Sequence, residues 1–220
     1  MKINVNLLLE NYIETINSDW FVGKFGQNKD IEHMDILKAL FEEKRGGDFA
    51  YWLFKTFKLS GICFLFEDGY ITSEISYKEG VRDGICKTFY RKYLLAEECT
   101  YKNGVKDGIY KEYYKAGKIR RVREQRNYIK GLMEGKCEEF YENGRTQYLT
   151  TYVNNLKEGF QSYFSYGGKI YNRIEYKEGK KTGSEENFKN GVLYEKRTYD
   201  EKRNIITVIC CGTQIIKNNC

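Results

Sequence analysis

The stretch Tyr101-Lys-Asn-Gly-Val-Lys-Asp-Gly-Ile-Tyr-Lys-Glu-Tyr-Tyr-Lys-Ala-Gly117 sets the plan of this chain, because its spacing of aromatic residues and glycines recurs on both sides of it. An opening aromatic residue returns every 23 to 27 residues, and a glycine and a second aromatic residue stand seven and twelve positions after it. The openers are Phe54, Tyr77, Tyr101, Tyr128, Tyr152, Tyr176 and Tyr199; the glycines are Gly61, Gly84, Gly108, Gly135, Gly159 and Gly183; the twelfth-position residues are Phe66, Phe89, Tyr113, Phe140, Phe164 and Phe188. Such self-similarity indicates a repeat architecture of six units with a degenerate tail.

Each repeat has the pattern of a β-hairpin. Segments such as Gly84–Tyr90 are rich in aromatic and β-branched residues and end at turn signals such as Glu67-Asp68-Gly69. The return segment Ile170–Tyr176 alternates between two faces, as a second strand does. Successive units are joined by Tyr-x-x-Gly-x-x-x-Gly, whose glycines permit the positive φ values of a tight reversal.

The repeats therefore predict a mainly β protein, an elongated single-sheet array of antiparallel hairpins. The sequence contains no proline, so nothing interrupts the ladder of central strands. Two strands per repeat advance the sheet by roughly 10 Å, and six repeats would make a rod on the order of 60 Å long. We expect the twelfth-position aromatic residues to form a buried file along this rod.

Residues 1–53 lack the repeat and predict a small α-helical N-terminal cap. Apolar residues recur at helical spacing from Leu8 and again from Ile31, and a third helical piece is expected after Gly46-Gly47-Asp48. These helices would cover the open edge of the first hairpin, with Trp20 and Trp52 as packing residues. The predicted organisation is a cap over 1–53, six repeats over 54–199 and a capping tail over 200–220.

The repeat from Tyr101 to Ile119 resembles the bacterial variant of the MORN repeat, which is found in proteins labelled as toxin–antitoxin system antitoxins. The resemblance covers roughly Phe54 to Tyr199. It implies an antiparallel hairpin array and a protein-binding role, and it implies a catalytic site only where another domain is present. Some MORN proteins are associated with phospholipids or lipid kinases.

No reactive constellation is visible, so we expect neither an enzyme nor a cofactor site. His33 is the only histidine, and no glycine-rich phosphate loop is present. The turn carboxylates Asp83, Asp107, Glu134 and Glu158 each stand alone at a repeat interval, which favours a turn role over calcium binding.

The seven cysteines indicate buried thiols rather than a metal site or disulfides. Cys63, Cys86 and Cys137 occupy equivalent repeat positions, and Cys210-Cys211 lacks the C-x-x-C spacing of a zinc site. The N-terminal stretch has neither the pattern of a signal peptide nor that of a membrane span, so the sequence predicts a cytoplasmic protein with reduced thiols.

One return strand departs from the others. The segment Lys118–Arg126 is three residues longer than its equivalents and carries five positive charges against one negative charge. Two interpretations stay open, a bulged solvated strand and a docking patch for an acidic surface. The candidate partner-binding residues are the basic Lys118, Arg120, Arg121, Arg123 and Arg126 and the aromatic Tyr90, Tyr114 and Tyr141.

Two function classes follow. The first is a non-catalytic protein-interaction module, in particular an antitoxin-like protein that binds and neutralises a protein partner. The alternative is a peripheral scaffold that touches membrane phospholipid through basic turns such as Lys177, Lys180 and Lys181. A net charge of +6 without a nucleic-acid-binding motif argues against nucleic acid as a partner.

Overall fold

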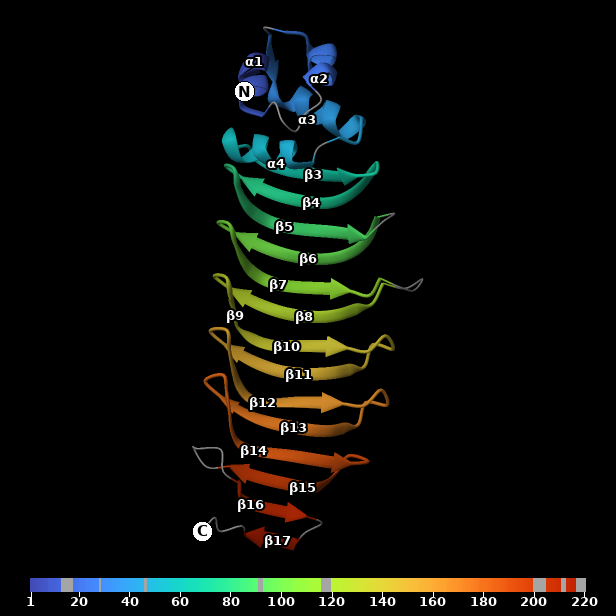
Figure 1. The fold of residues 1–220 in the computed structure, drawn as a ribbon, viewed down its shortest axis with the longest axis vertical. Helices are drawn as coiled ribbons and strands as arrows, with labels where there is room; N and C mark the ends of the chain where they lie inside the picture. The colour runs from blue at the N-terminus through green and yellow to red at the C-terminus, as the bar shows by residue number, and fades with distance from the viewer. Residues whose placement is uncertain are drawn as a thin grey trace. The chain divides into compact units, whose positions relative to one another are not determined.

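The protein is a chain of antiparallel β-hairpins preceded by short helices (Figure 1). The computed structural model describes residues 1–12, 18–27, 29–45, 47–90, 93–115, 120–199, 205–210 and 213–216. These residues confirm the predicted mainly β fold with its minor helical N-terminal part. The chain divides into two compact units, the first formed by Met1–Ala96 and Tyr101–Gly104 and the second by Glu97–Thr100 and Val105–Cys220.

The first unit contains all the helices of the described residues and the first hairpins. Its elements are β1 Lys2–Asn4, α1 Val5–Tyr12, α2 Ser18–Phe25, β2 Asp30–Glu32, α3 His33–Glu42, α4 Gly47–Thr56, β3 Gly61–Glu67, β4 Tyr70–Lys78 and β5 Val81–Tyr90, and β6 Leu94–Lys102 carries residues of both units. The helix predicted from Ile31 starts later than expected, because Ile31 lies in β2 and pairs with Ile3 of β1, and α3 begins at His33. Both isoleucines are buried, whereas the residues flanking them are exposed, which is the alternation of a short strand.

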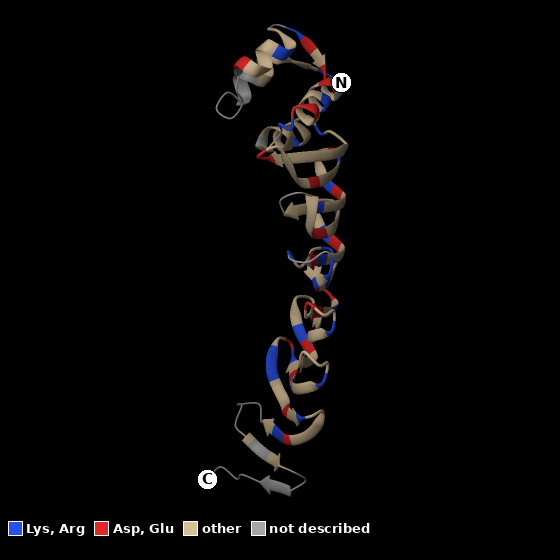
Figure 2. Cartoon of the chain, turned by 90° about the vertical axis from the view of Figure 1, so that its right-hand side faces the viewer, with Lys and Arg blue, Asp and Glu red and all other residues tan. Residues whose placement is uncertain are grey.

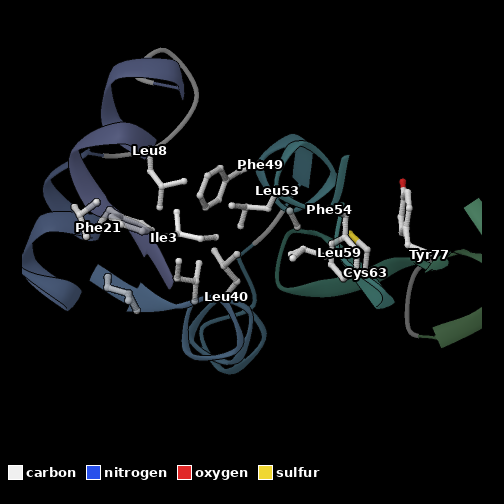
Figure 3. Packing of buried hydrophobic residues seen from close by; sticks show 14 of the residues in the cluster. Ile3, Leu8, Phe21, Leu40, Phe49, Leu53, Phe54, Leu59, Cys63 and Tyr77 are labelled. Carbon is white, nitrogen blue, oxygen red and sulfur yellow. The ribbon is translucent and has the colours of Figure 1, made fainter. Parts of the chain in front are cut away.

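Buried side chains from the helices and from strands β1 to β4 form the core of the first unit (Figure 3). The core includes Ile3, Leu8, Phe21, Leu40, Phe49, Leu53, Phe54, Leu59, Cys63 and Tyr77. Phe54 of α4 is fully buried, and its ring centroid lies 5.0 Å from that of Tyr77 in β4. Trp20 and Trp52 pack against this core as predicted, Trp52 stacking on Phe49 at 6.0 Å between centroids.

The second unit is a run of antiparallel strands that pair in sequence order, except that the short β9 lies off this path. Its elements are β7 Val105–Tyr113, β8 Val122–Ile129, β9 Leu132–Met133, β10 Gly135–Phe140, β11 Thr146–Val153, β12 Leu156–Phe164, β13 Ile170–Lys177, β14 Lys180–Lys189, β15 Val192–Tyr199, β16 Ile205–Cys210 and β17 Thr213–Ile216. β10 pairs with β8 on one side and β11 on the other, while the short β9 pairs with β8 alone. Because β16 pairs with β15 and β17 with β16, the hairpin array continues into the tail.

The seventh-position glycines lie opposite tyrosines. Gly108 pairs with Tyr128, Gly135 with Tyr152 and Gly159 with Tyr176, each glycine facing the opener of the next repeat. A glycine leaves the space on the sheet face that a cross-strand aromatic ring can cover, so opener and glycine form one packing unit. This pairing explains why the two positions recur together.

The reversals between repeats are two-residue turns with positive φ at both central residues, as in type I′ hairpins. Examples are Lys130-Gly131 at φ 50° and 85° and Asn154-Asn155 at φ 50° and 67°. The backbone N of Gly131 donates to the Lys106 carbonyl at 2.7 Å, which ties one repeat to the preceding one. The equivalent Asn155 donates to the Met133 carbonyl at 3.0 Å, and its Oδ1 accepts from the Met133 backbone N at 2.6 Å. Asparagine therefore replaces glycine here with an added hydrogen bond.

The carboxylates before the seventh-position glycines bind backbone amides of the following turn. Glu134 Oε2 accepts a hydrogen bond from the Asn154 backbone N at 2.8 Å, and Glu158 Oε2 accepts one from the Glu178 backbone N at 2.9 Å. In the first unit Asp83 Oδ2 accepts from the Asn103 backbone N at 3.0 Å. These contacts support the turn interpretation of the carboxylates.

The predicted buried file of twelfth-position aromatic residues is mostly wrong. Only Tyr113 is buried, at 4% exposure, and the other five side chains are half-buried. Among the openers of the second unit only Tyr128 is buried, and Tyr152, Tyr176 and Tyr199 are half-buried as well. Tyr110 and Cys137, two positions after their glycines, are buried. The described part of this unit is one sheet without a second layer, so a ring is covered only by its neighbours within the sheet.

Candidate interaction surface

Two of the basic candidates on the predicted docking strand, Arg123 and Arg126, pair with carboxylates. Arg123 Nε donates to Glu112 Oε1 at 2.9 Å, and Arg126 pairs with Glu124. Glu112 lies on β7, directly opposite Glu124 in the register, and Glu139 of β10 lies opposite Glu124 on the other side. The row Glu112, Glu124 and Glu139 therefore faces the arginines, and the excess of positive charge seen along the sequence does not form a free patch among these residues.

The pair Arg126–Glu124 is the most enclosed contact of this strand. Glu124 is 4% exposed, and the Arg126 guanidinium also lies 5.6 Å from the Tyr110 ring centroid. Burial would lower the pKa of Arg126, but hydrogen bonds with Glu124 and Tyr128 outweigh it and raise that pKa. Burial, and then repulsion by Glu124, raises the pKa of Glu139. Arg126 therefore stabilises the fold directly, whatever else it binds.

The remaining basic candidates are held less tightly. Arg120 is exposed and lies over the Tyr113 ring at 5.0 Å. Arg121, also exposed, donates to the Glu142 carbonyl in the turn of the next repeat. Lys118 lies outside the described residues.

The candidate tyrosines join neighbouring repeats. Tyr114 Oη donates to the Phe140 carbonyl at 2.5 Å, and Tyr141 Oη donates to the Phe164 carbonyl at 2.8 Å. Both side chains are half-buried, and burial raises the pKa of Tyr114. Tyr90 of the first unit is half-buried as well. The hydroxyls of Tyr114 and Tyr141 therefore already have partners within the sheet.

A different surface of the second unit exposes apolar side chains, at the turns that join one repeat to the next on the left of Figure 1. We name it the hairpin-tip stripe, and it consists of Val105, Ile129, Leu132, Val153 and Leu156. Each of these side chains is between 40% and 48% exposed. Ile129 pairs with Leu132 across one turn, and Val153 pairs with Leu156 across the next.

Two side chains of the stripe lie against the turn of the next repeat. A Cβ at Gly131 would lie 3.6 Å from Val105 Cβ, and one at Gly179 would lie 3.2 Å from Leu156 Cδ2. Val105 and Leu156 therefore pack in part on the turn of the following repeat, and both remain nearly half exposed. The sequence does carry a signal for the stripe, because Val81, Val105, Leu132 and Leu156 all stand four positions after an opener. From the sequence alone, this position looks like the first residue of an ordinary strand. Its exposure could not be predicted without knowing how the strands pair.

Charged residues are mixed over the chain. Figure 2 shows acidic and basic residues interspersed along the described strands. Lys177 and Lys180 lie directly opposite each other in the register, whereas Lys181 pairs with Glu185 at 2.9 Å. None of the described helices is long and apolar enough to cross a membrane.

Comparisons with known proteins assign no family to this chain. No protein-family model matches it, and no curated protein matches it either. Among solved structures, two matches are TarM from S. aureus in complex with fondaparinux, alpha-GlcNAc-glycerol and UDP, at a TM-score of 0.21, and a second structure of TarM, at 0.20. Both TarM structures are 11% identical to this chain, and each match covers 94% of it. The chain spans only 32% and 31% of the length of the two TarM chains. Likenesses this weak carry no argument, and the resemblance to MORN repeats stays a prediction.

Proposed function

We propose that this chain is a non-catalytic protein-interaction module that binds a protein partner across the hairpin-tip stripe. The observation that carries the proposal is the run of five large apolar side chains, each 40% to 48% exposed, on consecutive turns. Contiguous exposed apolar surface is typical of interaction sites, whereas single exposed apolar residues are ordinary. The resemblance to MORN repeats of antitoxin-like proteins supports the same role, a cytoplasmic neutraliser that blocks an effector by covering part of its surface.

The chemistry around the stripe favours a protein surface as the partner. Glu134 and Glu158 lie at the same turns, where their carboxylates accept backbone hydrogen bonds. Lys130 and Lys157 stand in the same turns, so this edge carries mixed charge without the basic cluster that attracts an anionic bilayer, while a protein interface commonly surrounds an apolar centre with a polar rim. The apolar tips and their carboxylates together match that anatomy.

A phospholipid scaffold is the second candidate, and one observation favours it. Lys177 and Lys180 are both exposed and face each other across the turn that follows Leu156 in the array. Like charges in direct opposition destabilise a sheet slightly, so an anionic headgroup between them would relieve repulsion. Pelleting with phosphatidylserine liposomes at moderate salt separates the candidates: the proposed function predicts that the protein stays in the supernatant.

The proposed function predicts that a double substitution, Val153→Lys with Leu156→Lys, removes partner binding. Placing two lysines in the centre of an apolar contact should weaken affinity for the captured partner by roughly 30-fold or more, because such central contacts are worth about 2 kcal/mol or more. Folding should change little, since both side chains are half exposed in the wild type. The measurement is quantitative affinity capture from the native cell, followed by titration with the purified partner.

A matched control uses Val192→Lys. Val192 is 69% exposed and flanks the two-residue turn Asn190-Gly191, which lies at the other end of the strands. The control should retain the partner. A partner that binds the Val153/Leu156 variant as tightly as wild type would remove the stripe from the proposal.

A further inference from the structure

The first unit contains an apolar groove between α3, α4 and the strand β3, with a volume of about 250 Å³. Buried side chains line its inner part, among them Leu40, Phe54 and Cys63 (Figure 3). Its rim is open to solvent, since Met34 is 60% exposed and Phe41 is 47% exposed. The groove is therefore a preformed apolar depression that a hydrocarbon group can enter.

The walls of the groove are side chains, and β3 offers no open edge to a further strand. α4 lies along β3 (Figure 1), and the Phe41 ring packs edge-on against Phe64 at 5.0 Å between centroids and against Phe66 at 5.9 Å. An occupant therefore meets hydrocarbon and aromatic rings and needs no backbone hydrogen bonds of its own. Phe64 stands ten positions after its opener, where the later repeats have the polar residues Lys87, Lys111, Glu138, Ser162 and Glu186. This apolar wall is thus specific to the first repeat.

The charged side chains that line the groove are both basic, Lys38 and Arg45, among the residues that the structure describes. The Lys38 side chain is 73% exposed, and its Nζ lies 3.9 Å from Glu42. Glu43 lies 3.8 Å from Arg45 Nε but 2.7 Å from Lys24 Nζ, so its charge is already balanced. Exposed ion pairs as long as these contribute little. Lys38 is therefore available to an incoming anion, and Arg45 adds positive potential at the same rim.

We propose that this groove binds a single-chain amphiphile with an anionic head, a free medium-chain carboxylate. Its hydrocarbon chain lies in the groove, and its carboxylate lies at the rim beside Lys38. The volume of about 250 Å³ holds on the order of eight methylene groups, if each takes about the 30 Å³ of a water molecule. Small-molecule sites likewise combine apolar walls with a few polar groups that fix the orientation of the ligand. This site goes beyond the proposed function and does not rest on the hairpin-tip stripe.

The test is isothermal titration calorimetry of the full chain with decanoate. The wild-type protein should bind one decanoate per chain with a Kd below about 1 mM. Decyltrimethylammonium has the same chain and a cationic head, and it should bind at least about tenfold more weakly. Hexanoate should also bind at least about tenfold more weakly, because it removes four fewer methylene groups from water.

Two pairs of variants locate the ligand. Met34→Glu should weaken decanoate binding by about tenfold or more, because it places a carboxylate at the rim, whereas Val81→Glu, at an exposed position of β5 outside the lining, should not. Lys38→Glu should weaken binding by about fivefold or more. Lys102→Glu, which reverses an exposed lysine of β6 outside the lining, should bind like wild type. Circular dichroism of each variant checks that its fold is unchanged.

Four outcomes would overturn the inference. They are a Kd above about 1 mM, uptake of decanoate that does not saturate at one site per chain, equal binding of decyltrimethylammonium, and equal binding by folded Met34→Glu. The Val153→Lys/Leu156→Lys variant should bind decanoate like wild type. Loss of decanoate binding in that variant would place the ligand on the hairpin-tip stripe and contradict a site in the groove.

Discussion

Gly80→Ala is expected to lower the free energy of unfolding by about 2–5 kcal/mol. Gly80 has φ +79°, and a Cβ there would lie 2.9 Å from Lys58 Cα and 3.0 Å from the Phe54 carbonyl oxygen. These are backbone atoms, so they cannot move aside as a flexible side chain can. The Gly80 backbone N also donates to the Leu59 carbonyl at 2.9 Å, which holds the turn against the end of α4.

Gly191→Ala is the matched control for this substitution. Gly191 has nearly the same φ, +84°, but no atom lies within 4 Å of the position its Cβ would take. Only the strain of a left-handed alanine remains, about 1–2 kcal/mol. Chemical denaturation of the two variants measures the difference. Equal shifts of the midpoint would show that φ alone, and not close packing of the turn on the preceding repeat, requires glycine at position 80.

Arg126→Ala is expected to cost about 3 kcal/mol of stability at pH 7. The substitution leaves Glu124, which is 4% exposed, without the guanidinium that pairs with it. Removing one partner of a buried ion pair typically costs about 3–5 kcal/mol, and the lower end applies because the Arg126 side chain is 35% exposed and water can reach the site. The measurement is the free energy of unfolding from denaturant titration.

Arg123→Ala separates this structural role from a general effect of removing charge. Arg123 lies on the same strand and also pairs with a glutamate, but its side chain is 44% exposed and that of Glu112 is 18% exposed. We expect a loss of about 1 kcal/mol or less. A loss at Arg123 as large as that at Arg126 would contradict the assignment of Glu124 as the enclosed carboxylate.

The hairpin array could be predicted from the sequence because its signals are local. The glycine seven positions after an opener is needed for the cross-strand pair with the next opener, as Gly135 pairs with Tyr152. Gly or Asn at the second turn position is needed for the positive φ of the turn. The helical cap was predicted in type, but the pair β1–β2 was not, because three residues are too few for a strand pattern to stand out.

The candidate site could not be predicted in the same way, because it depends on register. Five positive charges from Lys118 to Arg126 suggest a docking patch when counted along the chain, yet Glu112 and Glu139 reach the strand from its neighbours. The burial of the twelfth-position rings likewise depends on a covering layer, which repeat spacing does not encode. The exposure of Leu132 and Leu156 follows from their place beside a turn, which only the paired strands define.

The central claim, that a protein partner docks on the hairpin-tip stripe, is tested most directly by hydrogen–deuterium exchange of the full chain with and without the captured partner. The proposed function predicts that the partner slows exchange in the turns around residues 129–132 and 153–156. The turn at residues 190–191 should exchange at the same rate in both samples. Protection confined to residues 121–126 would contradict the claim and would place the interface on the basic strand. Unchanged exchange in the turns around residues 129–132 and 153–156 would contradict it as well.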